Sequence, residues 1–102
     1  MNASQAVSEM KNILKSNGFE DAGIVTDEEH EDGVGAGVGQ NWWKSGVLYT
    51  EAQAMRECGK GIALFNKRGE QREVFKTSRA VYSSSKFHAE QGHTFSFEIV
   101  DL

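Results

Sequence analysis

The chain divides at residues 33–46, which read GVGAGVGQNWWKSG. Glycine stands at every second position in the first half of this stretch, and a backbone without side chains has too much freedom to hold its own shape. Two large apolar side chains follow, Trp42 and Trp43, which either bury against a fold or anchor a partner. An acidic run precedes the glycines. We therefore expect a mobile, acidic and glycine-rich loop over residues 27–41, fixed at its far end by the tryptophans.

Length and composition indicate one domain that spans residues 1–102. The chain has 102 residues, of which 38% are hydrophobic and 25% charged, as in a folded globular protein. No apolar run approaches the ~20 residues that cross a bilayer, and the first residues lack the pattern of a signal peptide. The single cysteine, Cys58, cannot form an internal disulfide. We therefore expect a cytoplasmic protein that does not contact a membrane.

The formal net charge of −4 conceals two segments of opposite charge. Residues 20–32 contain seven acidic residues and no lysine or arginine, whereas residues 60–86 contain seven basic residues and two acidic ones. Separated charges of this kind create local fields that the total charge does not report. Each segment is either a solvated surface or a binding surface.

The first helix is predicted over residues 3–16. Val7, Met10 and Leu14 lie at the spacing of one helical face, and Asn2 is a good residue to begin the helix. The pair Asn17-Gly18 supplies a stop.

A second helix is predicted between Thr50 and Gly59. Thr50 is a plausible N-cap with Gln53 three residues later, and the glycine ends the helix. The apolar residues 47–49 then form the entry to this helix.

The remaining apolar segments predict strands. A hairpin is expected around the turn at residues 66–69, and the final strand places Phe95, Phe97 and Ile99 on one face. An alternative for Ser85 is the cap of a short helical turn. The expected strands cover residues 22–26, 62–65, 72–77, 79–88 and 94–101. Together these elements predict an α+β fold, with a mainly antiparallel sheet of about four strands and two helices packed on one face.

No catalytic, metal or cofactor motif is present. The alternating glycines fit neither the dinucleotide fingerprint G-x-G-x-x-G nor the Walker A sequence, and the acidic run does not match a calcium loop. His88 and His93 would lie close together across the expected last hairpin, but the metal-ligand spacings of zinc sites are missing. We therefore expect no cofactor, no bound metal and no catalytic residue.

The leading hypothesis is a small acidic protein that binds another protein and has no enzymatic activity. Its partner would carry a basic surface, as nucleic-acid-handling proteins do, because opposite charges steer association. Small acidic inhibitors from phages and mobile elements share this profile of size and charge, which is an analogy of class. The expected partner-binding residues are Asp27, Glu28, Glu29, Glu31, Asp32, Trp42 and Trp43.

Three alternatives stay open. The basic strands within residues 60–86 could bind single-stranded nucleic acid, because they interleave cations with aromatic side chains. A small enzyme with a pocket near the glycine-rich loop is a second alternative. The final strand could also pair with a second copy of the chain as an exposed sheet edge. The residues expected to contact nucleic acid are Lys67, Arg68, Arg72, Lys76, Arg79 and Lys86.

Overall fold

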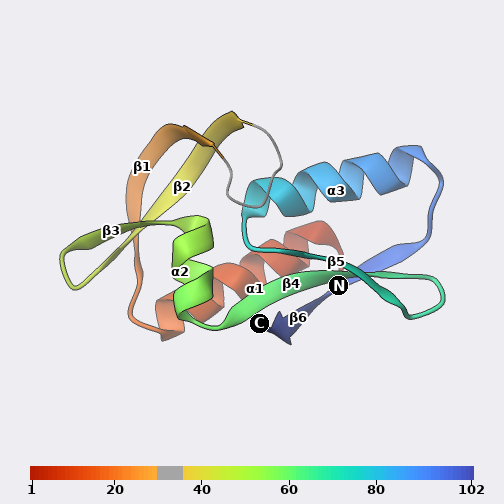
Figure 1. Ribbon diagram of the computed structural model, residues 1–102, viewed down its shortest axis with the longest axis horizontal. Helices are drawn as coiled ribbons and strands as arrows, with labels where there is room; N and C mark the ends of the chain where they lie inside the picture. Colours follow the sequence, from red (N-terminus) through yellow and green to blue (C-terminus); the bar gives the residue numbers. More distant parts are fainter. Residues whose placement is uncertain (30–35) are drawn as a thin grey trace.

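The computed structural model describes the backbone of residues 1–29 and 36–102 and the side chains of residues 1–23 and 40–102. In this part of the chain the fold has three helices and two three-stranded antiparallel sheets, which confirms the α+β class (Figure 1). The helices are α1 (Ala3–Ser16), α2 (Glu51–Glu57) and α3 (Ser78–Glu90). The first sheet, of order β1-β2-β3, contains β1 (Glu20–Glu29), β2 (Ala36–Lys44) and β3 (Val47–Thr50). The second sheet, of order β5-β4-β6, contains β4 (Lys60–Asn66), β5 (Gln71–Phe75) and β6 (Phe95–Asp101). The architecture thus differs from the expected single sheet with two helices.

Helix α1 has the bounds and the cap that the sequence predicts. Asn2 Oδ1 accepts a hydrogen bond from the Gln5 backbone N–H at 2.9 Å, and Gln5 Oε1 accepts one from the Asn2 N–H at 2.9 Å. This reciprocal capping box satisfies two of the N–H groups that a helix start leaves free. The apolar face of α1 packs against β4, β6 and α3. Its buried residues are Ala3, Ala6, Val7, Met10 and Leu14.

The expected loop over residues 27–41 is largely replaced by strands. β1 continues to Glu29 and β2 begins at Ala36, with these two residues paired across the strands; residues 30–35 lie outside the described part of the chain. The expected strand at residues 22–26 is therefore the middle of a longer one. The pairing register shifts between Asp21 and Val25, which marks a bulge. Cross-strand hydrogen bonding, a non-local effect, thus outweighs the local preference of the glycines.

Strand β3 leads directly into helix α2, which begins after Thr50. The predicted entry at residues 47–49 belongs to a strand that pairs with β2, so its assignment to the start of a helix is wrong. The predicted cap of α2 is confirmed, because Thr50 Oγ1 accepts a hydrogen bond from the Gln53 N–H at 3.2 Å. Helix α2 contacts β2 and β3 in one sheet and β4 in the other. It therefore joins the two sheets, as Figure 1 shows.

The carboxylate of Glu51 strengthens this joint from the first residue of α2. Glu51 is only 4% exposed. Its Oε2 accepts a hydrogen bond from Trp42 Nε1–H at 3.3 Å, and its Oε1 accepts one from the backbone N–H of Ser78 at the start of α3. A carboxylate is also favoured at the positive end of a helix. One buried side chain therefore ties β2, α2 and α3 together.

The second sheet confirms the predicted hairpin and the predicted final strand. β4 and β5 are joined by the turn at residues 66–69, in which Gly69 has a φ of 76°. β4 lies at the centre of the sheet, with Ile62 facing Ile99 and Leu64 facing Phe97 across the pairing with β6. These side chains pack in the core that α1 covers.

The expected strand over residues 79–88 is wrong, because this segment belongs to helix α3. Thr77 begins the helix, and its side chain accepts a hydrogen bond from the Ala80 N–H at 3.1 Å. Ala80 and Val81 form the buried part of the helix, while Phe87 is exposed. The β-branched and aromatic residues Val81, Tyr82 and Phe87 favour a strand locally, but a threonine cap and packing against α1 select the helix.

The outer edge of β6 is partly occupied by the first residue of the chain. The Met1 amino group donates a hydrogen bond to the Phe97 carbonyl at 2.9 Å, and the Phe97 N–H donates one to the Met1 carbonyl at 2.9 Å. In an antiparallel sheet alternate residues point their backbone groups to the same edge. Met1 thus covers the middle of the edge that a homodimer through β6 would use, and a second copy would have to displace it.

We expect the substitution Glu51→Ala to lower the free energy of unfolding by about 2–3 kcal/mol, because one buried and one partly buried N–H group lose their acceptor. Urea unfolding measures this change. The matched control is Glu57→Ala, which removes an exposed carboxylate from the same helix and should change stability by less than about 0.5 kcal/mol. Equal effects of the two substitutions would contradict the role of Glu51.

Candidate functional site

The two adjacent tryptophans lie on opposite faces of β2. Trp42 is 1% exposed and belongs to the core, whereas Trp43 is 37% exposed. Successive side chains of a strand alternate between the two faces of a sheet. Because Glu51 bonds the Trp42 indole on the inner face, Trp43 is directed to the outer face.

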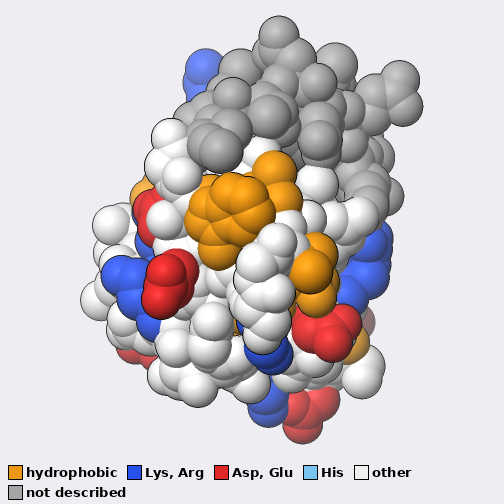
Figure 2. Space-filling view, turned by 90° about the vertical axis from the view of Figure 1, so that its left-hand side faces the viewer, with side chains coloured by type: hydrophobic (Ala, Val, Ile, Leu, Met, Phe, Trp, Pro, Cys, Tyr) orange, Lys and Arg blue, Asp and Glu red, His pale blue; other side chains and the backbone are white. Residues whose placement is uncertain are grey.

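The outer face of the first sheet carries an apolar cluster beside a carboxylate. Trp43 pairs with Leu48 of β3 on one side and with Glu20 of β1 on the other, so the three side chains share this face. Leu48 is 42% exposed and Glu20 is also exposed. We call these three residues the tryptophan face. Figure 2, which views this end of the molecule, shows hydrophobic side chains at its centre with charged side chains on either side.

The expected acidic residues are only partly described. Asp27, Glu28 and Glu29 lie in the backbone of β1, and their side chains are outside the described part; Glu31 and Asp32 are outside the described residues altogether. On the described part of β1, Glu20 flanks Trp43, and the Asp21 carboxylate accepts hydrogen bonds from the Gln40 side chain and the Gly23 N–H. Strand pairing therefore brings one acid of β1 to Trp43. The sequence did not single out Glu20 or Leu48, because only the register shows that they flank the tryptophan.

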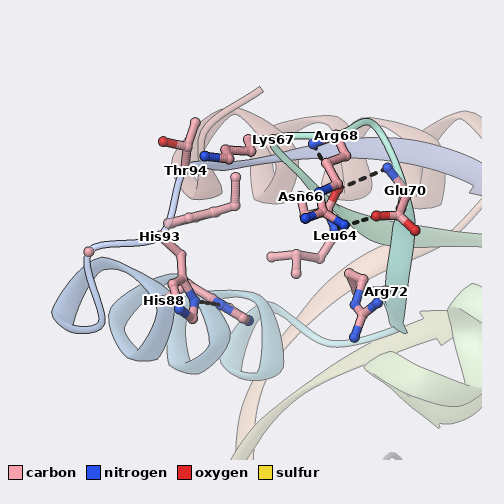
Figure 3. Close-up of a pocket in the computed structure, with 11 residues that line it drawn as sticks. Leu64, Asn66, Lys67, Arg68, Glu70, Arg72, His88, His93 and Thr94 are labelled. Atoms are coloured by element: carbon pink, nitrogen blue, oxygen red, sulfur yellow. Dashed lines mark hydrogen bonds between the residues drawn. The ribbon is translucent and has the colours of Figure 1, made fainter.

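A second candidate site is a pocket at the far end of the second sheet. It has a volume of about 530 Å³ and lies between the β4–β5 turn and the connection from α3 to β6. We call it the hairpin pocket. Figure 3 shows the side chains of the turn on one side, His88 and His93 on the other, and Leu64 between them. The lining residues include Lys67, Arg68, Glu70, Arg72, Thr94 and Phe95.

The turn that carries Lys67 and Arg68 is held by Asn66. Asn66 Oδ1 accepts hydrogen bonds from the backbone N–H groups of Arg68 at 2.9 Å and Glu70 at 3.0 Å. Its Nδ2 donates to Glu70 Oε1 at 3.2 Å, and its carbonyl accepts from the Gly69 N–H at 3.0 Å. Such side-chain bonds to a turn fix the backbone before any ligand binds. The basic side chains therefore extend from an ordered frame.

The opposite wall of the hairpin pocket is a pair of histidines. His88 Nδ1 and His93 Nδ1 lie 3.1 Å apart, and the His88 ring contacts that of Phe95 at a centroid distance of 5.7 Å. The expected proximity of the histidines is confirmed, although it arises at the end of α3 and not across a hairpin. Their place opposite the basic turn depends on the fold and could not be read from the sequence.

The six expected nucleic-acid contacts do not form one strand surface. Three of them line the hairpin pocket, namely Lys67, Arg68 and Arg72. Lys76 is half-buried after β5, while Arg79 and Lys86 are exposed on α3, where a strand was expected. The structure thus brings together half of this set.

Cys58 lies at the end of α2 and is partly buried. Burial raises the pKa of its thiol above the usual value, Lys44 opposes this change and Glu57 adds to it. A raised thiol pKa leaves little thiolate near neutral pH, which is unfavourable for a nucleophile. Among the described residues, no group of three or more His, Cys, Asp or Glu side chains could hold a metal ion. The expected enzyme pocket near the glycine-rich stretch lies largely outside the described side chains.

Comparison with known proteins identified no similar protein. No protein-family model matches the chain, and no curated protein or solved structure is significantly similar to it. In residues 1–29 and 36–102, none of the helices has the length and apolar character needed to cross a membrane.

Opposite roles are expected for the two tryptophans. Trp42→Ala should lower the free energy of unfolding by about 3–5 kcal/mol, because it leaves a large cavity in the core. Trp43→Ala should lower it by less than about 1 kcal/mol, because this side chain lies at the surface. Urea unfolding of both variants measures the difference, and a large loss for Trp43→Ala would identify that residue as structural.

Proposed function

We propose that this chain is a small protein-binding protein that engages a basic surface of its partner through the tryptophan face and the acidic residues of the preceding strand. The observation that carries the proposal is the exposure of Trp43 beside Leu48 on a sheet face whose other side forms the core. The expected partner is a protein that handles nucleic acid, because such proteins present basic surfaces. A phage- or mobile-element-type inhibitor of a nucleic-acid-handling protein is one example of such a binding protein.

The apolar part of the tryptophan face is well suited to anchor a partner. Trp43 is held in a paired strand between β1 and β3, so little ordering of its backbone is needed on binding. Tryptophan is enriched among the residues that dominate interface energies, and truncation of such an anchor costs about 2 kcal/mol or more. Burial of Trp43 against a partner would thus supply one anchor of this kind.

The acidic residues of β1 favour a partner with a basic surface. β1 contributes Glu20 next to Trp43 and includes Asp27, Glu28 and Glu29 further along, while β1 contains no lysine or arginine. Carboxylates at the rim of an interface speed association with a basic surface, and added salt screens this effect. A basic surface with an apolar pocket is therefore the complementary partner.

The test begins with capture of proteins from a nuclease-treated lysate of the source organism and identification of the retained protein. The affinity of that purified partner is then measured by calorimetry for the unmodified chain and for Trp43→Ala. We expect Trp43→Ala to weaken binding at least about tenfold, equivalent to about 1.4 kcal/mol, with slower association at higher salt.

The matched control is Phe87→Ala, which removes another exposed aromatic side chain from a different surface, on α3. It should leave the affinity unchanged. Charge reversal at Glu28, Glu29, Glu31 and Asp32 should weaken binding further, and mainly through the association rate. A partner that binds Trp43→Ala as tightly as the unmodified chain would contradict the proposal.

A further inference from the structure

We infer that the hairpin pocket binds a phosphate monoester, either on a small ligand such as a nucleotide or at the end of a nucleic-acid strand. This inference is independent of the protein-binding function proposed for the tryptophan face, since the two sites use different sheets (Figure 1). A volume of about 530 Å³ is in the range of pockets that hold small ligands.

The charges at the pocket favour an anion. Three cationic side chains, Lys67, Arg68 and Arg72, line it with one carboxylate, Glu70. Asn66 already donates a hydrogen bond to that carboxylate. In the described part of the chain, none of the three cations has an ion-pair partner. Cations that line one pocket are suited to an external anion, and arginine matches the oxygens of a phosphate group in particular.

The histidine pair supplies a further donor. A hydrogen bond between Nδ1 atoms 3.1 Å apart leaves the accepting ring with its own proton on Nε2, which is a donor that the pair can offer to a ligand. Two imidazoles at this separation could also ligate a cation, but three neighbouring positive side chains disfavour a metal ion.

The apolar lining indicates what the phosphate is attached to. Leu64 lies between the two polar walls, and Phe95 contacts the His88 ring (Figure 3). Leu64 is 1% exposed and belongs to the core, so Phe95, which is partly exposed, is the side chain that can pack against a sugar or a base, as aromatic side chains do in nucleic-acid sites. The pocket is bounded by the turn and by the end of α3, whereas Arg79 and Lys86 lie elsewhere on that helix. A terminal phosphate therefore fits this site better than a long phosphodiester track along residues 60–86.

The test uses calorimetry with three probes: inorganic phosphate, adenosine 5′-monophosphate and adenosine. We expect both phosphates to bind with millimolar or lower dissociation constants and adenosine to bind at least tenfold more weakly. Exposed cations are screened by water and salt, so a tight complex with inorganic phosphate is not expected. Arg68→Ala and Arg72→Ala should each weaken the binding of adenosine 5′-monophosphate at least threefold.

The control variant is Lys86→Ala, which removes an exposed cation that does not line the pocket. It should bind like the unmodified chain, and unfolding curves should show that all variants fold. Trp43→Ala should also bind adenosine 5′-monophosphate normally, which separates this inference from the proposed function. Equal losses for Lys86→Ala and Arg72→Ala, or no binding of either phosphate probe at millimolar concentration, would overturn the inference.

A pair of single-stranded oligonucleotides distinguishes the two sources of phosphate. They have the same sequence, with and without a 5′-phosphate. Tighter binding of the phosphorylated strand than of adenosine 5′-monophosphate supports a nucleic-acid end, and the reverse supports a small ligand. Equal, tight binding of both strands would overturn the inference in favour of a phosphodiester track.

Discussion

The buried carboxylate of Glu51 is the interaction on which the arrangement of the two sheets depends. It accepts hydrogen bonds from the Trp42 indole and from the backbone of Ser78, and it stands at the start of the helix that contacts both sheets. A charged group with so little exposure is stable in a protein only if its oxygens are satisfied. Its two hydrogen bonds therefore link β2, α2 and the start of α3, whose apolar side chains share one core.

The arrangement of β2, α2 and α3 positions two surfaces of the molecule. With Trp42 held inward, the alternation of the strand directs Trp43 outward, where Leu48 and Glu20 flank it. At the other end, α3 runs from the Glu51 contact towards the β4–β5 turn and delivers His88 opposite the basic residues of that turn. The molecule is elongated, with a longest dimension of 43 Å, so the two surfaces lie at separate ends (Figure 1). A protein contact at one end and an anion at the other are thus sterically compatible.

Signals within short stretches of the sequence predicted the elements whose structure depends on neighbouring residues. The capping residues Asn2 and Thr50 begin the helices where expected, and the alternation of β6 separates its buried Phe97 from exposed Glu98. The glycine-rich stretch was misread because strand pairing is non-local, and glycine preferences do not report the partner strand. The segment that became α3 was misread for a related reason, since its helical structure depends on packing against α1, which local preferences do not report.

The candidate sites were predictable only in part. The sequence indicated both Trp42 and Trp43 without choosing between them, and it indicated the basic pair Lys67 and Arg68, because large aromatics and charged turns are visible without a fold. Only the structure separates the buried Trp42 from the exposed Trp43. The sequence provided no means to place Leu48 beside Trp43, since that proximity results from the pairing of β2 with β3. Nor could it place the histidines against the turn, because this juxtaposition requires α3 to be a helix.

Hydrogen exchange of the two indole N–H groups, followed by nuclear magnetic resonance, tests the central claim most directly. The account predicts slow exchange for Trp42, whose N–H is buried and bonded to Glu51, and fast exchange for Trp43. Replacement of Glu51 by Ala should accelerate exchange at Trp42 alone. Equally slow exchange at both indoles, or fast exchange at Trp42 in the unmodified chain, would contradict the account.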